Sequence, residues 1–105
     1  MNAANIFDAI PSVLNEELFE SIVATDTVKI ERIVSKGHTT PIGRWYNQDR
    51  HEWVIVLKGS ATIECEHEKP LHLKEGGYLN IPAGTKHKVT WTDPEIETLW
   101  LAVHY

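Results

Sequence analysis

Two stretches of the sequence decide the fold: residues 52–59, EWVIVLKG, and residues 76–87, GGYLNIPAGTKH. The first is a run of β-branched and aromatic residues that ends at Gly59, which is typical of a strand followed by a tight turn. In the second, Pro82 ends a short apolar segment, because proline cannot donate a hydrogen bond to a sheet. Gly84 follows at a position where a turn favours glycine. Both stretches predict short strands joined by tight turns.

The chain on either side continues this pattern. Ala61, Ile63 and Cys65 alternate with polar residues, as expected for a strand with one buried face. Similar short segments bounded by glycine, proline or aspartate are residues 27–35, 71–74, 78–81, 86–92 and 98–105. Seven or eight strands at this spacing predict an all-β fold, an antiparallel sandwich or barrel.

One segment before the strands has a different pattern. Leu14, Leu18 and Ile22 recur at four-residue spacing, and Ser12 is a plausible N-cap. This spacing predicts one short amphipathic α-helix from Ser12 to about Ala24, packed on a larger body. We therefore expect residues 1–25 to form an N-terminal extension with this helix, ahead of the β-domain of residues 26–105.

Composition limits the class of protein. A chain of 105 residues is long enough for one domain, and its hydrophobic fraction of 42 % argues against disorder. The formal charge of −5 argues against a nucleic-acid or anionic-membrane partner. No apolar run or signal-like N-terminus is present, and the lone Cys65 permits no internal disulfide, so we read it as a small core residue. We expect a cytoplasmic protein.

The two stretches together resemble the two signature motifs of the cupin superfamily, and more narrowly its small single-domain bacterial members. The first family motif is His-x-His, then Glu three or four residues on, then Gly after six more. Glu52 and Gly59 match its second half. The second motif is Gly, five residues, Pro-x-Gly, two residues, then His, and it is matched from Gly76 to His87. The resemblance implies a double-sheet antiparallel β-barrel, or jelly roll, and a homodimer.

The histidine pair of the first motif is absent. Counting back from Glu52 by the three-residue spacing places Gln48 and Tyr46 at the two histidine positions. The four-residue spacing would place Asn47 and Trp45 there instead. Amide and phenol oxygens are weaker ligands than imidazole for Zn, Fe, Ni or Cu at neutral pH. The sequence therefore predicts a depleted metal site.

The resemblance also implies roles for the residues at these positions. Gln48, Glu52 and His87 would bind a divalent metal such as Zn, Fe, Mn or Ni, and Glu52 would move a proton in any catalysis. Tyr46, Gln48, His87 and Trp91 would contact a small molecule. Trp91 stands where the family motif has Asn, and it is expected to share a strand face with His87.

The remaining histidines form no obvious cluster. His51 is next to Glu52 and should point to the opposite face, whereas His38 lies in a loop before the first motif, so each has a small chance of reaching the cavity. Three others are predicted to face solvent, namely His67, His72 and His104.

Three functions stay open at this point. The first is a metal-binding protein acting as an isomerase, lyase or dioxygenase on a small molecule. The second is a metal-free small-molecule binder or sensor. The third is a structural or interaction domain without catalytic activity. Of these, a small-molecule site is favoured, because carboxylate, amide, imidazole and aromatic groups converge on one predicted cavity. The fold does not choose among the activities.

Overall fold

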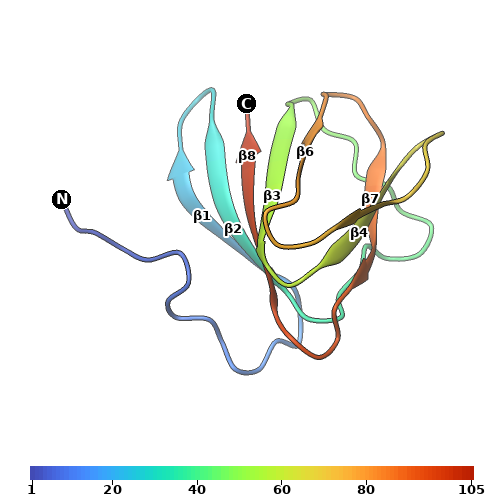
Figure 1. The fold of residues 1–105 in the computed structure, drawn as a ribbon. Helices are drawn as coiled ribbons and strands as arrows, with labels where there is room; N and C mark the ends of the chain where they lie inside the picture. The colour runs from blue at the N-terminus through green and yellow to red at the C-terminus, as the bar shows by residue number, and fades with distance from the viewer.

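The computed structural model describes residues 1–105 and shows two facing antiparallel sheets (Figure 1). The larger sheet has five strands in the order β1-β2-β8-β3-β6, and the smaller has three in the order β5-β4-β7. The strands are β1 (Leu18–Ala24), β2 (Lys29–Ser35), β3 (Glu52–Lys58), β4 (Ala61–Cys65), β5 (Leu71–Leu73), β6 (Tyr78–Ile81), β7 (His87–Thr92) and β8 (Thr98–His104). The all-β prediction is confirmed.

The apolar core lies between the two sheets and follows the alternation read from the sequence. Along β3, Glu52, Val54 and Val56 are buried while the residues between them are half-buried. Along β4, Ala61, Ile63 and Cys65 point inward from the opposite sheet. Cys65 is a buried core residue, as predicted. Burial of this apolar surface is the main stabilising term for such a fold.

The predicted N-terminal helix is wrong, and the structure contains no helix at all. Residues from Leu18 to Ala24 form the edge strand β1, which pairs with β2 from Leu18↔Val34 to Ala24↔Lys29. A spacing of four is a multiple of two, so Leu14, Leu18 and Ile22 fit a strand as well as a helix. The neighbouring residues Ile22 and Val23 in β1 favour the strand, since β-branched residues fit a pleated sheet better. Because β1 is paired to β2, the expected boundary at residue 25 cuts through the five-stranded sheet.

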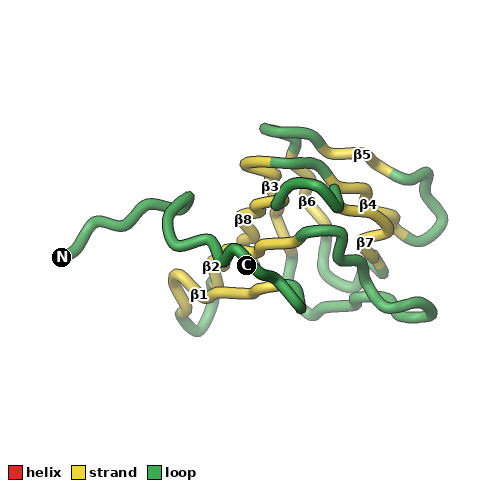
Figure 2. The backbone as a smooth tube through the Cα atoms, turned by 90° about the horizontal axis from the view of Figure 1, so that it is seen from below, coloured by secondary structure: helices red, strands yellow, loops and turns green.

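The segment ahead of β1 runs away from the body of the molecule at its N-terminus (Figure 2). Nearer to β1 it is held by Arg32 of β2, whose side chain is 8 % exposed. The Arg32 guanidinium donates hydrogen bonds to the carbonyl oxygens of Ile6, Asp8 and Ala9 and pairs with the Glu20 carboxylate. A buried guanidinium needs acceptors of this kind, and this segment supplies three of them.

The space between the sheets has two ends, and the strand directions determine which residues lie at each. At one end, β2 and β3 begin and β8 finishes, which brings together Glu31, Glu52 and His104; we call this the polar end. At the other end, β3 finishes and β8 begins, around Gly59 and Thr98; we call this the packed end. The two ends therefore differ in composition, with ionisable side chains at the polar end and a tight turn at the packed end.

Candidate functional site

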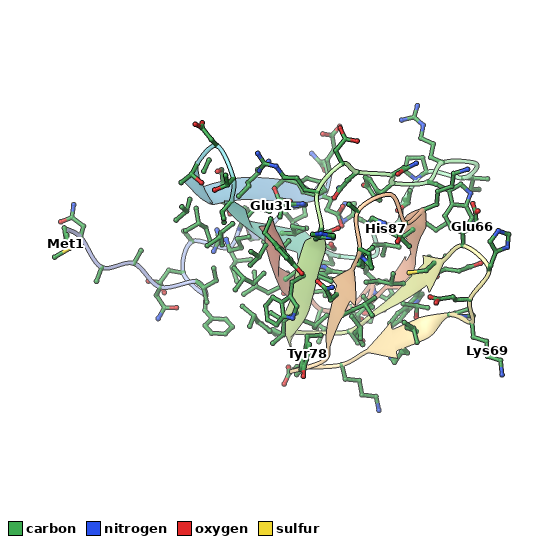
Figure 3. All side chains as sticks on the ribbon, turned by 90° about the horizontal axis from the view of Figure 1, so that it is seen from above. Met1, Glu31, Glu66, Lys69, Tyr78 and His87 are labelled. Atoms are coloured by element: carbon green, nitrogen blue, oxygen red, sulfur yellow. The ribbon has the colours of Figure 1, made fainter.

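A cavity of about 70 Å³ lies between the sheets and opens toward the polar end. Its floor is apolar and includes Ile33, Val54 and Trp100. Its polar lining comes from both sheets and from the loops beside them: Glu17, Glu31, Tyr46, Gln48, Glu52, His87 and His104. Figure 3 labels Glu31 and His87, which stand on opposite sheets. An apolar cavity with a few converging polar groups is the usual form of a small-molecule site.

The structure brings together the four residues placed by the three-residue spacing. Tyr46 forms a β-bridge with His87, with backbone N···O distances of 2.7 and 3.0 Å, and Gln48 and Glu52 line the same cavity. The residues of the alternative spacing, Trp45 and Asn47, are exposed and do not line it. The placement of the four residues therefore follows the predicted spacing, whereas the roles assigned to them remain predictions.

Glu52 and His87 form a buried pair across the gap between the sheets. The Glu52 Oε1 to His87 Nε2 distance is 3.2 Å, and His87 Nδ1 lies 3.0 Å from the carbonyl oxygen of Thr85. Burial alone would lower the pKa of His87, but the hydrogen bonds to Glu52 and Thr85 outweigh it and raise that pKa above its ordinary value of 6.5. With an acceptor at each ring nitrogen, the geometry favours the imidazolium form.

A second buried pair, His104 with Glu31, was not predicted. We expected His104 to face solvent, but it is 9 % exposed and its Nε2 lies 2.9 Å from Glu31 Oε1 and 4.0 Å from Glu52 Oε2. The prediction is wrong because β8 continues to its last residue with Trp100, Ala102 and His104 all on the inner face. That alternation was present in the sequence and would have found His104.

Trp91 does not line the cavity, so the expectation that it shares a strand face with His87 is wrong, and its contact with a small molecule stays a prediction. The pairing of β4 with β7 skips a position between Ile63↔Val89 and Thr62↔Trp91. The extra residue, Thr90, is a β-bulge, and a bulge reverses which face the following side chains occupy. Trp91 consequently packs beside His72 on the outside, with ring centroids 5.6 Å apart.

Glu17, just before β1, is a further cavity residue that the sequence reading missed. The Ser35 hydroxyl hydrogen-bonds to Glu17 Oε2, and the same Ser35 oxygen accepts a hydrogen bond from Trp100 Nε1 at 3.2 Å. Burial raises the pKa of Glu17 above its ordinary value of 4.5, against the smaller lowering effects of Ser35 and His38. Because the sequence pattern placed Glu17 in a helix, it did not indicate that this side chain lines a cavity.

One polar atom in the cavity has no partner. Gln48 Oε1 is a buried side-chain oxygen that accepts no hydrogen bond from the protein. A buried acceptor left unsatisfied costs about 1–3 kcal/mol, so a ligand that donates to it would recover that free energy.

The other histidines lie elsewhere. His51 Nδ1 accepts a hydrogen bond from the backbone N–H of Ala83 at 2.9 Å, and its ring packs on Tyr105. His38 Nδ1 accepts from the backbone of Lys36. Neither His51 nor His38 lines the cavity. His67 and His72 are exposed, as predicted.

Comparison with known proteins gives the family. The cupin domain family matches residues 32–104 of this chain. The chain belongs to the cupin family. A comparison with curated proteins finds no match.

Solved cupin-like structures agree with this assignment. A protein from Ralstonia eutropha JMP134, described as a candidate mannose-6-phosphate isomerase, is 41 % identical, with a TM-score of 0.95 over 99 % of this chain and 97 % of that one. An RmlC-like cupin family protein with a double-stranded β-helix fold from Methanocaldococcus jannaschii is 22 % identical, with a TM-score of 0.71 over 90 % and 84 %. A conserved protein of unknown function from Streptococcus pyogenes is 17 % identical, with a TM-score of 0.77 over 98 % and 85 %. The last two show the fold alone.

The metal ligands that the cupin motifs imply do not fit the donor set of this cavity. No group of three or more His, Cys, Asp or Glu side chains is placed to hold a metal ion. His87 directs one ring nitrogen at Glu52 and the other at the Thr85 carbonyl, so its imidazolium form has no lone pair for a metal. Gln48 offers only an amide oxygen, which transition metals bind weakly. The predicted ligands Gln48, Glu52 and His87 thus line one cavity, but their side chains are weak donors for a transition metal.

No helix in the structure has the length and apolar character needed to cross a membrane.

Proposed function

We propose that this cupin binds a small organic molecule in the cavity between its sheets, and that it does so without a metal. The observation that carries the proposal is Gln48 Oε1, a buried acceptor without a partner, in a cavity that Glu31 and Glu52 also line. A ligand with N–H or O–H donors would satisfy these oxygens directly. The Glu52–His87 pair fixes the Glu52 carboxylate in place to receive such a donor.

The size of the cavity limits how much of the ligand is enclosed. About 70 Å³ holds only a few groups the size of a water molecule. Beside it lies an open groove of about 420 Å³, which shares Phe19, Glu31, Gln48 and His104 with the cavity. The ligand therefore places one polar end in the cavity and extends along the groove toward solvent.

The proposal is tested by a ligand screen on protein treated with EDTA, read by NMR chemical-shift changes at the cavity residues. We expect binding to survive the chelator and to weaken in Gln48→Leu. The matched control is Asn47→Leu, one residue away on the exposed side, which should bind as the wild type does.

Metal binding through Gln48, Glu52 and His87 is the competing function. Elemental analysis of protein purified without added metal decides between the two. Stoichiometric Zn, Fe, Mn or Ni that is lost in His87→Ala would overturn the metal-free proposal.

Isomerisation of a sugar is a second candidate, favoured by the buried Glu52–His87 pair and by the description of the Ralstonia relative. Glu52 would take a proton from the hydroxyl-bearing carbon next to the carbonyl and return it to the former carbonyl carbon, while the hydroxyl proton passes to the former carbonyl oxygen, so that a new carbonyl forms and the carboxylate is regenerated. An assay with mannose 6-phosphate and the Glu52→Gln variant tests this. Turnover abolished by Glu52→Gln supports it, and absence of turnover in the wild type contradicts it.

We also propose that a second copy of the chain covers β1. This strand pairs with β2 on one side only, and it exposes Phe19, Ile22 and Val23. An unpaired apolar edge of this kind favours association. Light scattering should show a dimer for the wild type and a monomer for Ile22→Lys. A monomeric wild type would refute the proposal.

A further inference from the structure

The charged lining of the cavity indicates which kind of ligand it accepts, and this inference rests on the proposed binding function. The ionisable side chains around the cavity are three glutamates, two histidines and one tyrosine, and no lysine or arginine lines it. Two of the three carboxylates have basic partners. Glu52 lies 3.2 Å from His87, and Glu31 lies 2.9 Å from His104 and 3.4 Å from the Lys29 ammonium.

Glu17 is the carboxyl without a basic partner. It takes part in none of the ion pairs of the molecule, and its side-chain hydrogen bond is to the neutral Ser35 hydroxyl. His38 is the one basic group whose charge favours ionised Glu17, and burial outweighs it. A half-buried carboxylate with no cation beside it is unstable as an anion. A cation from a ligand would stabilise the ionised form of Glu17, because the protein itself provides none at this position.

The Glu17 side chain is also held in a fixed orientation. Trp100 Nε1 donates to Ser35 Oγ at 3.2 Å, which leaves the Ser35 hydroxyl proton directed at Glu17 Oε2. Ser35 and Trp100 are both buried, so this chain of hydrogen bonds does not rearrange freely. Side chains held in this way bind a ligand with a smaller loss of conformational entropy.

We infer that the ligand carries a primary ammonium group, which the Glu17 carboxylate receives inside the cavity. An ammonium has three N–H donors and no acceptor, so it suits a cavity rich in acceptors. Gln48 Oε1 remains available for a second donor of the same molecule. Aromatic side chains of Phe19, Tyr46 and Trp100 line the same space and tolerate a cation better than an anion.

The same lining disfavours an anionic group. A phosphate or carboxylate inside the cavity would face Glu17, Glu31 and Glu52 with no lysine or arginine to neutralise it. If a sugar phosphate such as the one in the Ralstonia relative's description binds here, its phosphate stays in the open groove, where Lys29 and Arg50 lie.

Three small probes of similar size test the inference: n-propylammonium, 1-propanol and propionate. Each is titrated into EDTA-treated, isotope-labelled protein, and the dissociation constant is taken from the shifts of cavity amides. We expect propylammonium to bind most tightly and propionate not to bind. In Glu17→Gln, the affinity for propylammonium should fall about tenfold, the loss expected for one charge-assisted hydrogen bond, while 1-propanol is unaffected.

The control variant is Glu16→Gln, which removes the same charge from the neighbouring exposed residue and should leave propylammonium binding unchanged. Equal losses in Glu16→Gln and Glu17→Gln would overturn the inference, because they would show a non-specific charge effect. The order of the three probes on the wild type decides the question even where Glu17→Gln fails to fold.

The outcomes separate this inference from the proposed function. Binding of 1-propanol or propionate in the cavity at least as tight as that of propylammonium overturns the ammonium inference and leaves a metal-free binding site. If none of the three probes shifts the cavity residues, both the inference and the proposed function fail.

Discussion

The two ends of the space between the sheets are built from different residues, although the same strands run through both. At the polar end, β3 and β8 contribute Glu52 and His104, and Gln48 has an unpartnered oxygen. At the packed end, the same two strands contribute Val56 and Thr98, both fully buried. One end contains groups that are costly to bury, and the other supplies apolar burial and closed hydrogen bonds that offset the cost.

Hydrogen bonds show the same difference. At the packed end, Thr98 Oγ1 donates to the Ser60 carbonyl at 3.0 Å, and Thr92 Oγ1 donates to the His38 carbonyl at 2.6 Å. At the polar end, two carboxylates and two imidazoles form a row in which each group lies within 4.0 Å of the next, in the order Glu31, His104, Glu52 and His87. The comparison indicates that the packed end provides stability, whereas the polar end contains the groups on which the proposed binding rests.

The largest expected effect is at a packed-end turn. A Cβ added at Gly59 would lie 2.6 Å from Thr98 Oγ1 and 2.8 Å from the Glu97 carbonyl oxygen, and Gly59 has φ of +86°. Gly59→Ala should destabilise by about 3–5 kcal/mol, measured by urea unfolding, because overpacking adds to backbone strain.

Gly84 is the matched position at the polar end. Its φ is +77°, but nothing lies within 4 Å of an added Cβ, so Gly84→Ala should cost only about 1–2 kcal/mol from backbone strain. This positive φ confirms that the turn after Pro82 favours glycine at residue 84. Equal losses in the two variants would remove the distinction between the two turns.

The next effect compares a buried valine at the packed end with an exposed valine ahead of β1. Val56→Ala removes two methyl groups from a fully buried packed-end site and should destabilise by about 2 kcal/mol, measured as a shift in the denaturation midpoint. Val13→Ala, at a position 72 % exposed, is the control and should change stability by less than about 0.5 kcal/mol. A Val56→Ala variant as stable as the control would show that the packed end does not provide the stability.

A pH effect is expected only at the polar end. Because the folded-state pKa of His87 is raised above 6.5, its pairing with Glu52 stabilises fully below about pH 6.5 and loses this contribution as pH rises through the folded pKa. The difference in unfolding free energy between wild type and Glu52→Gln should therefore be largest near pH 6 and shrink by about pH 9. Glu75→Gln, an exposed change of the same charge, should show no such trend. A constant difference across this range would contradict the pairing.

The smallest effect has the opposite sign. The folded-state pKa of Glu17 is raised above 4.5 by burial, so folding becomes less favourable as pH rises from about 4.5 through the folded value. Glu17→Gln should then be more stable than the wild type at pH 7 by about 1 kcal/mol or less, and the gain should vanish below pH 4.5. Thermal unfolding at the two pH values measures this. A destabilised variant at pH 7 would show that Glu17 is already ionised and satisfied.

Most of the strands could be predicted from the sequence, but only some of the residues that line the cavity could. Spacing from Glu52 placed Tyr46 and Gln48 in the same cavity as His87, although both precede β3, and only Tyr46 pairs with His87, through an isolated β-bridge. Trp91 was misplaced because a bulge is a single-residue change in register that alternation cannot reveal. The helix was predicted wrongly because a four-residue spacing of Leu14, Leu18 and Ile22 fits the period of a helix and also the two-residue period of a strand.

His104 and Glu17 were missed for related reasons. Each lies at the end of an element, where the sequence does not show whether the pattern continues. Finding His104 required that β8 keep its alternation to the last residue, and finding Glu17 required that the residues after it form a strand and not a helix. Both became cavity residues only when the sheet order placed β1, β2 and β8 side by side.

The anchoring of the N-terminal segment by Arg32 bears on where this domain can be cut. The region that matches the family begins at residue 32, yet Arg32 is buried and finds its acceptors on Ile6, Asp8, Ala9 and Glu20, all upstream. A fragment trimmed to the matching region would leave the Arg32 guanidinium without these acceptors, and it would also lose β1 and the first residues of β2, including Glu31. The folding unit is thus longer than the family region, and limited proteolysis should stop before residue 6.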